Sequence, residues 1–317
     1  MASSRGHSWV ALGLLLSFVA LAATANGDEL SPGYYEKTCP NVQRVVRSVM
    51  ASSVAAQPRM APAVLRLFFH DCFINGCDAS VLLDATPFSA SEKDVKPNAS
   101  LTGYTIIDDI KSALEHDCPA TVSCADVIAL ASRDAVALLG GPTWSVPLGR
   151  KDSRFAADPE SIENGLPSPH DDLAELVAMF SKLNLDARDM TALSGAHTVG
   201  MANCMHYGDR VYGTNRDEEI DPSFAQTMQQ TCQDPSDSDE VRQRLLPQPY
   251  RAARSPHLRP DSLRGGGLQD NLVKMYSADG EAFARDFAKA MVKMGNVPPP
   301  MGMPVEVRLK CSMANNY

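Results

Sequence analysis

Apolar residues recur every three to four positions along most of this chain, which is the period of an amphipathic helix. The pattern predicts helices over residues 42–50, 106–114 and 173–183. An Ala/Leu-rich run that ends at GGP predicts a helix over 123–139, and we expect a further helix over 282–294, before a glycine and a run of prolines. Long alternating runs, which are typical of β-strands, are not evident, so we expect an all-α fold. Residues 140–169 are rich in Gly, Pro and Asp and predict a loop that joins two lobes.

The first 25 residues have the pattern of a secretory signal peptide. Arg5 and His7 precede an apolar run over residues 9–23, and the small residues ATA end the segment. The run is too short to cross a bilayer comfortably, and a buried N-terminal helix is the alternative. We therefore expect a secreted protein whose mature part is residues 26–317, with no membrane-spanning segment.

Composition and charge exclude one class of partner. The chain is 44% hydrophobic, enough for a large packed core, and its formal net charge is −9. Because a nucleic-acid-binding protein needs a basic face, we expect no nucleic-acid partner. Eight cysteines behind a signal peptide predict four disulfides, whose pairing the spacing leaves open. A zinc site is the alternative, but the chain has no paired CxxC elements.

Arg66 and His70 are the first candidates for chemistry. They lie four residues apart in RLFFHDC, so a helix places them on one face. A cation beside an imidazole suits a reaction that moves protons, because imidazole titrates near neutral pH. A core histidine beside an ion-paired arginine is the alternative.

The next segment, DCFINGCDAS, is rich in hard oxygen donors of the kind that Ca²⁺ prefers. The candidate ligands are Asp71, Ile74, Gly76, Asp78 and Ser80, with backbone carbonyls from the two apolar positions. The segment is not an EF-hand, because a leucine stands at the twelfth position. An acidic surface loop closed by a local disulfide is the alternative.

A second histidine, His197, lies between two glycines in LSGAHTVG. Asp186 predicts the N-cap of a short helix that ends near Ser194, so His197 follows a helix end. Glycine lets a bulky planar group approach the backbone, and a neutral imidazole there can ligate a metal or a haem iron. A capping or core histidine is the alternative.

These pieces occur in an order that resembles the secretory (class III) plant haem peroxidases. The matching phrases are YYEKTCP, RLFFHDCFINGCDASVLLD, SEKDVKPN, CPATVSCADVIALASRD, GGPTWSVPLGRKDS, LPSP, LSGAHTVG, AMVKMGN and VEVRLKC. The resemblance implies a two-lobed, helical haem peroxidase fold with b-type haem (heme b) between the lobes. It also implies the disulfides Cys39–Cys118, Cys72–Cys77, Cys124–Cys311 and Cys204–Cys232.

The resemblance assigns roles around the haem. His197 is similar to the axial ligand of the iron, and His70 to the distal acid–base that moves a proton between the oxygens of hydrogen peroxide. Arg66 is similar to the residue that stabilises charge during O–O cleavage. Phe69 would wall the haem space, and Asn98 would hold the other nitrogen of His70. Asn98 also begins a glycosylation sequon, a competing interpretation because a buried asparagine cannot carry a glycan.

Further implied features concern calcium and the reducing substrate. The 71–80 segment, together with Glu92, matches a distal Ca²⁺ site, and Thr198 matches one ligand of a second, proximal Ca²⁺ site. Pro167 matches a position near the entrance for reducing substrates. The implied cycle is a two-electron oxidation of the haem by hydrogen peroxide, followed by two one-electron reductions by small phenolic donors. We expect a monomer in the extracellular space, the cell wall or the vacuole.

The chain departs from the family between residues 233 and 267. This atypical segment alternates acidic and Arg/Pro-rich blocks without apolar periodicity, which is typical of a disordered loop. It lacks the DxxTPxxFDN motif that supplies most proximal Ca²⁺ ligands, and the SDQ triplet whose carboxylate holds the axial histidine. Asp261 and Asp270 could replace that carboxylate, although we interpret them as a loop charge and a helix N-cap.

Several hypotheses follow from this departure. The segment is either a misread or misspliced exon, or part of a genuine peroxidase that has been weakened. A scaffold that binds haem and Ca²⁺ without turnover is the alternative function. A secreted, disulfide-rich helical protein without a cofactor is a third hypothesis.

Overall fold

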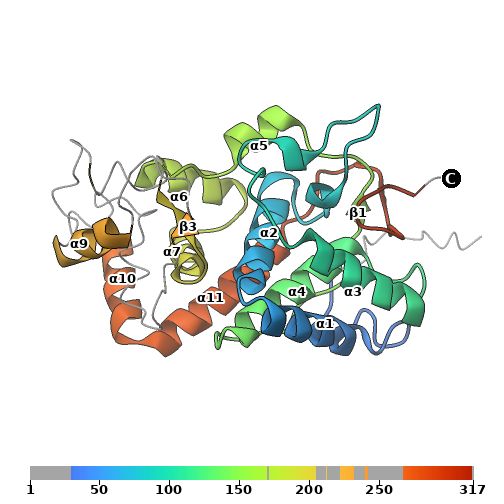
Figure 1. Cartoon of the computed structure of the whole chain (residues 1–317), viewed down its shortest axis with the longest axis horizontal. Helices are drawn as coiled ribbons and strands as arrows, with labels where there is room; N and C mark the ends of the chain where they lie inside the picture. The colour runs from blue at the N-terminus through green and yellow to red at the C-terminus, as the bar shows by residue number, and fades with distance from the viewer. Residues whose placement is uncertain are drawn as a thin grey trace, which may run out of the picture.

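Figure 1 shows a computed structural model of the chain, which describes residues 30–169, 171–204, 212, 222–231, 240–241 and 267–315. This part is mostly helical, as expected, and each of its named strands has two residues. No helix among the described residues is long and apolar enough to span a membrane. The signal peptide and most of the atypical segment lie outside the described residues.

Four helices form one lobe, on the right of Figure 1. They are α1 (Val42–Ala56), α2 (Met60–Asn75), α3 (Tyr104–Asp117) and α4 (Cys124–Leu138). The helix α4 is central, because almost all of its residues are buried and both α1 and α2 pack against it. Ser123 begins α4 by accepting a hydrogen bond from the backbone N–H of Asp126.

The second lobe, on the left of Figure 1, carries the helices of the later sequence. They are α6 (Leu173–Lys182), α7 (Ala187–Ser194), α9 (Pro222–Thr231) and α10 (Leu268–Ala278). Asp186 caps α7 with a reciprocal pair of hydrogen bonds to Asp189, so the predicted N-cap is confirmed. The 3₁₀ turn η3 (Gly195–Thr198) follows α7 directly and carries His197.

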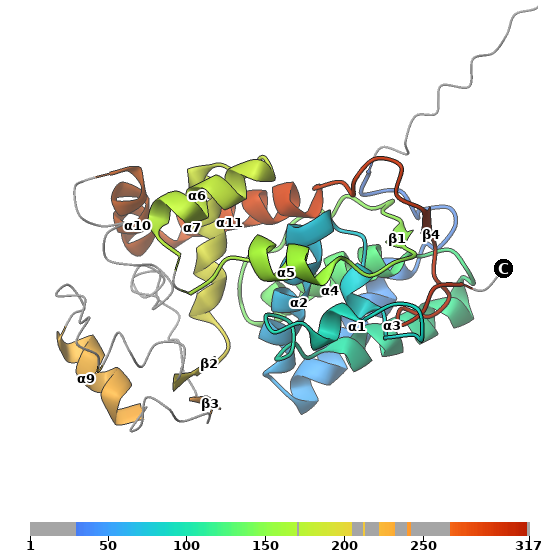
Figure 2. The ribbon, with the colours of Figure 1, turned by 90° about the horizontal axis from the view of Figure 1, so that it is seen from above.

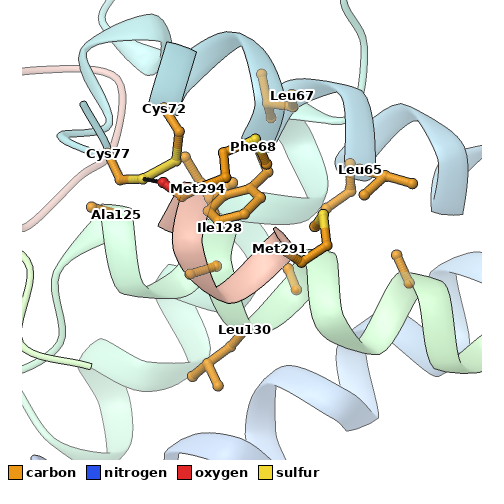
Figure 3. Packing of buried hydrophobic residues seen from close by; sticks show 14 of the residues in the cluster. Leu65, Leu67, Phe68, Cys72, Cys77, Ala125, Ile128, Leu130, Met291 and Met294 are labelled. Atoms are coloured by element: carbon orange, nitrogen blue, oxygen red, sulfur yellow. Dashed lines mark hydrogen bonds between the residues drawn. A yellow bond between two sulfur atoms is a disulfide. The ribbon is translucent and has the colours of Figure 1, made fainter. Parts of the chain in front are cut away.

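The helix α11 (Gly280–Gly295) joins the two lobes (Figure 2). Near its C-terminal end, Met291 and Met294 pack among buried side chains of α2 and α4, including Phe68 (Figure 3). Arg150 donates to the carbonyl of Gly295 through Nε at 2.8 Å and Nη2 at 2.6 Å. These contacts fix α11 against the first lobe.

The segment between the lobes is not wholly a loop. Residues 140–169 contain the two-residue strand β1 (Asp152–Ser153) and the helix α5 (Pro159–Gly165), so the prediction of a loop throughout was wrong. Asp158 caps α5 by accepting a hydrogen bond from Ser161, and Pro159 occupies the first turn. Proline and aspartate, which we interpreted as loop formers, here start a short helix.

Two small antiparallel pairs complete the described elements. The strand β1 pairs with β4 (Val305–Glu306), which ties the chain's C-terminal part to the first lobe. The strand β2 (Ala202–Asn203) pairs with β3 (Glu240–Val241). These two β3 residues belong to the atypical segment, so there the expectation of disorder was wrong, because they pair with β2.

Three of the four implied disulfides lie wholly within the described residues. They are Cys39–Cys118, Cys72–Cys77 and Cys124–Cys311. Cys204 is also disulfide-bonded, and its implied partner, Cys232, lies outside the described residues. The bond from Cys124 to Cys311 joins α4 to the C-terminal segment, across 187 positions of sequence.

Candidate active site

Arg66 and His70 lie one turn apart on α2, as the spacing of four predicts. The Nε of Arg66 donates a hydrogen bond to Nε2 of His70 at 3.2 Å. Phe69 lies between them in sequence and forms an aromatic cluster with Phe73 of α2 and Phe180 of α6. This cluster brings the two lobes together beside His70.

The second nitrogen of His70 is held by Asn98. The two side chains meet at 2.7 Å between Nδ1 and Oδ1, and Nδ2 of Asn98 donates to the carbonyl of Glu92 at 3.1 Å. Because the Arg66 Nε–H can only donate, Nε2 of His70 is the acceptor and Nδ1 carries the proton. Asn98 is 2% exposed, so its amide has no room for a glycan.

The environment keeps the imidazole of His70 neutral. Burial, and then the charge of Arg66, lower the pKa of His70 to about 3. The hydrogen bond with Asn98 opposes this shift only in part. His70 is therefore a neutral base at ordinary pH, with the lone pair of Nε2 directed toward the arginine.

Two residues that sequence reasoning missed hold the guanidinium of Arg66. Its Nη1 donates to Oγ of Ser100 at 3.0 Å, and its Nη2 donates to the carbonyl of Pro97 at 3.0 Å. These partners are more than thirty positions away in sequence. The only sequence signal at Ser100 is the glycosylation sequon, which points to a different function.

His197 carries a neutral imidazole. Burial, followed by the charge of Arg66, lowers the pKa of His197 to about 4, so the ring is in the neutral form that ligates iron. His197 also contributes to lowering the pKa of His70, so the two imidazoles are near enough to interact. Both His197 and Arg66 are accessible to solvent, although the surrounding protein lowers the pKa of each.

Gly195 has a packing role. A Cβ atom at this position would overlap the ring of Phe283 of α11, so only glycine lets that ring lie against the turn that carries His197. The ring of Phe283 lies 5.6 Å from each of the rings of Tyr276 and Phe287. The close approach expected at this glycine therefore includes a protein side chain.

Asp71 of α2, together with Asp78 and Glu92 beyond the helix, forms a buried acidic group with unused oxygens. Both carboxylate oxygens of Asp71 and one of Asp78 are buried and make no hydrogen bond. Glu92, in the 3₁₀ turn η2 (Glu92–Asp94), accepts a hydrogen bond from the backbone N–H of Ala157 at 2.7 Å. Ser80, the first residue of the turn η1 (Ser80–Leu82), donates its N–H to Asp78 at 2.9 Å. Oxygens left without partners in the interior are the donors that a hard cation needs.

Burial and mutual repulsion act on these carboxyl groups. Burial raises the pKa of Asp78 to about 7 and raises that of Asp71 well above its ordinary value, where Asp78 and Glu92 add to the effect. Arg308, which is fully buried nearby, partly opposes both shifts. Within the described ranges, no three His, Cys, Asp or Glu side chains are close enough to form a metal site by themselves.

The remaining ligand positions of this segment differ in exposure. Gly76 follows α2 with a φ of 75°, and a Cβ there would overlap the carbonyl of Pro298. Ile74 is half-buried and packs against Gly165 at the end of α5. Pro167, also half-buried, lies two residues beyond that contact. Pro167 therefore follows, by two residues, a glycine that lies against Ile74 of α2.

Thr198 and Asp270, two further residues that the sequence singled out, lie in η3 and α10 of the second lobe. The hydroxyl of Thr198 donates to the carbonyl of Gly195 at 2.8 Å, which leaves its lone pairs to accept. Asp270 pairs with Lys274 at 2.7 Å in the first turn of α10. The N-cap of that helix is Gly267, so the interpretation of Asp270 as the cap was wrong. Asp261 lies outside the described residues.

Comparisons with known proteins extend over both lobes. The family model described as Peroxidase matches residues 46–255. The chain is similar to Peroxidase 2 of Oryza sativa subsp. japonica, with 41% identity over 315 residues, 95% of this chain and 98% of that protein. It is similar to the lignin-forming anionic peroxidase of Nicotiana sylvestris, with 40% identity over 320 residues, 98% of each chain. Peroxidase P7 of Brassica rapa subsp. rapa is 41% identical over 302 residues, 90% of this chain and 100% of that protein.

Proposed function

The chain belongs to the class III plant haem peroxidases, and on that premise we propose that it reduces hydrogen peroxide at Arg66 and His70 and oxidises small phenolic donors. The observation that carries this assignment is the state of His70. Its imidazole is buried and neutral, Asn98 fixes its tautomer, and a guanidinium lies against its basic nitrogen. This is the arrangement that peroxide reduction needs, because the reaction moves one proton and creates negative charge.

Each residue of the pair has a separate task. Nε2 of His70 would accept a proton from one oxygen of hydrogen peroxide and return it to the other, which leaves as water when a bound haem supplies the two electrons. Arg66 stabilises the negative charge that develops on the leaving oxygen, at a position already oriented by its hydrogen bonds. Asn98 keeps the proton of His70 on Nδ1 throughout, so that Nε2 is the nitrogen that exchanges it.

The residues present fit a haem group. His197 would hold the iron through a neutral ring nitrogen, and Phe69 would contribute to the wall of the space. When bound, the haem supplies the two electrons that peroxide takes up. The protein contributes the proton transfer, the charge stabilisation and the exclusion of bulk water.

We further propose that a Ca²⁺ ion binds beside the C-terminal end of α2, the helix that carries Arg66 and His70. Asp71 and Asp78 supply carboxylates, Glu92 contributes through a water molecule, Ser80 supplies oxygen, and Ile74 and Gly76 supply carbonyls. The support is the set of buried oxygens without partners, which would otherwise leave charges uncompensated in the interior. A proximal Ca²⁺ site would use Thr198, but most of its other expected ligands are absent from the sequence.

The class of electron donor and the location of the protein are inferred from one relative and from the sequence. One similar protein is named a lignin-forming anionic peroxidase, and this chain is also acidic, with a net charge of −9. We propose phenolic donors that approach near Pro167, and a monomer secreted after removal of residues 1–25. The mature peroxidase domain is residues 26–317, in the extracellular space, cell wall or vacuole.

Stopped-flow spectroscopy tests the assignment. The mature protein is loaded with haem and Ca²⁺, mixed with one equivalent of hydrogen peroxide, and followed through its Soret band. We expect a fast shift that His70→Ala slows by about 10²- to 10⁴-fold, the usual contribution of a general acid–base. A wild-type protein that binds haem but shows no shift would refute the proposed reaction.

A weakened scaffold is the second candidate function. The sequence lacks the SDQ carboxylate, and Asp270, one possible replacement, bonds to Lys274. The missing triplet would supply a carboxylate that acts on the ligating histidine, and the loss of such a residue typically lowers metal affinity or activity by about 10- to 100-fold. A measured reduction potential above that of a relative with the SDQ triplet would favour this candidate, and an equal potential would exclude it.

A further inference from the structure

The turn after η2 lies against two functional residues at once. It is closed by backbone hydrogen bonds from Asn98 and Ala99 to the carbonyl of Val95, at 2.8 and 3.0 Å. A further bond joins Leu101 N–H to the carbonyl of Asn98 at 2.8 Å. Residues 95–101 therefore form a fixed turn, on which Asn98 faces His70.

The same turn holds the guanidinium of Arg66 with two acceptors. Its three nitrogens each donate one hydrogen bond: Nε to His70, Nη1 to Ser100 and Nη2 to Pro97. A guanidinium has five N–H groups in a rigid plane. The two that are left, one on each terminal nitrogen, make no hydrogen bond within the described part of the chain.

Of these acceptors, Ser100 is the one whose side chain can be removed without changing either the backbone or the proposed catalytic pair. Pro97 acts through its carbonyl, and His70 is itself part of the catalytic pair. The Ser100 side chain is exposed, so its replacement creates no cavity in the core. Glycosylation does not explain this serine, because Asn98, the acceptor of the sequon, is 2% exposed.

We propose that Ser100 is a positioning residue that sets the orientation of Arg66 for the reaction with peroxide. By fixing Nη1, it holds the plane of the guanidinium in place while Nε donates to Nε2 of His70. This inference rests on the proposed function, since it assigns a task within the same site. Without the hydroxyl, Nη1 loses its acceptor and the guanidinium samples more than one orientation.

The test uses the haem-loaded protein and three variants at one position. Ser100→Ala removes the hydroxyl, while Ser100→Thr and Ser100→Val form a pair of equal shape that differs only in the hydroxyl. Ser52→Ala is the control, because Ser52 is an exposed serine of α1 that bonds only to the carbonyl of Ser48. Two quantities are measured: the second-order rate constant with hydrogen peroxide, and the affinity of the ferric protein for fluoride. Fluoride is a small anion whose binding to iron depends on a cation held nearby.

We expect Ser100→Ala and Ser100→Val to lower both quantities by about tenfold, the effect of losing one hydrogen bond to a charged group. Ser100→Thr and Ser52→Ala should stay within about twofold of wild type. In an Arg66→Leu background, adding Ser100→Ala should change nothing further, because Ser100 acts only through the arginine.

Three results would overturn the inference. They are an unchanged fluoride affinity in both Ala and Val variants, equal losses in the Thr and Val variants, and a full loss in the Arg66→Leu background. A wild type that binds haem and fluoride but ignores peroxide would refute the proposed function, while fluoride binding would still decide the role of Ser100. A wild type that takes up no haem would overturn both.

Discussion

Nδ1 of His70 and Oδ1 of Asn98 lie 2.7 Å apart, and this contact, together with the Arg66 N–H that points at Nε2, leaves Nε2 as the nitrogen that can act as a base. Asn98 is itself fixed by the carbonyl of Glu92, which belongs to the buried acidic group. The orientation of the His70 imidazole on α2 therefore depends on Asn98 and Glu92, which belong to the segment that follows α2 in sequence. A substitution in that segment can therefore change the rate of the proposed reaction although the substituted residue does not contact the substrate.

The first prediction concerns this contact. Asn98→Val removes the acceptor for Nδ1, so His70 can adopt the other tautomer or rotate. We expect the rate constant with hydrogen peroxide to fall by about 10- to 100-fold, which corresponds to losing about 1.4–3 kcal/mol of orientation. Stopped-flow measurement of the Soret shift checks this value, with circular dichroism to confirm folding.

Thr102→Val is the matched control for this prediction. Thr102 is an exposed residue of the same connection, and the substitution has the same polar-to-apolar character. We expect it to leave the rate constant unchanged. Equal rates for Asn98→Val and wild type would show that His70 is oriented by other contacts.

The second prediction concerns pH. Burial and the charge of Arg66 lower the pKa of His70 to about 3, so the neutral base persists well below pH 6. The rate constant should be constant from pH 8 to about pH 4 and then fall as the imidazole takes up a proton. pH-jump stopped flow separates this titration from slower acid unfolding.

Removing the charge of Arg66 should shift the dependence of the rate constant on pH to higher pH. Arg66→Leu eliminates a positive charge that disfavours protonated His70, so the pKa of His70 should rise and the inflection should move to higher pH. The reaction should also be slower at every pH. An inflection near 6.5 in the wild type would mean that the imidazole is not buried as described.

How much of this site the sequence alone predicts depends on the distance between partners. Arg66 and His70 are four positions apart, and helical period alone places them together. The link from His70 to Asn98 came only from the family resemblance, because nothing local connects residues 28 positions apart. The contact between Arg66 and Ser100 has no signal in a single sequence.

The fold shows the same difference between features set by nearby residues and features set by residues far apart in sequence. Apolar period predicted the amphipathic helices α1, α3 and α6, since each of these buries one face against the core. The helix α5 was missed because it has seven residues and buries only Ile162, too little for a period to emerge. The pairing of β1 with β4 joins segments more than 150 positions apart, and two-residue strands carry no alternating pattern.

The third prediction concerns calcium and stability. In protein freed of Ca²⁺, burial raises the pKa of Asp78 to about 7, above its value in the unfolded chain. The folded state then binds a proton that the unfolded state has lost, so this contribution to stability is present at about pH 4 and disappears as pH rises to 7. The loss is roughly 4 kcal/mol at most, and Asp71 changes in the same direction.

Calcium should reverse this trend. Ca²⁺ binds the ionised carboxylates, so its stabilising effect should grow as pH rises from 4 to 7. Thermal melting at several pH values, with calcium removed by gel filtration and then restored, measures both curves. If melting temperatures with and without Ca²⁺ run parallel across this range, Asp71 and Asp78 do not form the proposed site.

The fourth prediction concerns Gly195, which lies two residues before His197. A methyl group at this position would overlap the ring of Phe283, so Gly195→Ala must displace either α11 or the turn that carries His197. We expect a loss of about 1–3 kcal/mol in the free energy of unfolding, together with weaker haem binding. Thermal melting and haem titration through the Soret band measure the two effects.

A second substitution distinguishes between causes of this loss. Phe283→Leu removes the ring that Gly195→Ala would strike, so the double variant should recover most of the haem affinity lost by Gly195→Ala. Gly267→Ala is the control, because nothing lies within 4 Å of the added atom and φ at Gly267 is −66°. If the double variant loses as much as the two single variants combined, then Phe283 is not the reason for glycine at this position. The requirement would then lie with the group that His197 holds.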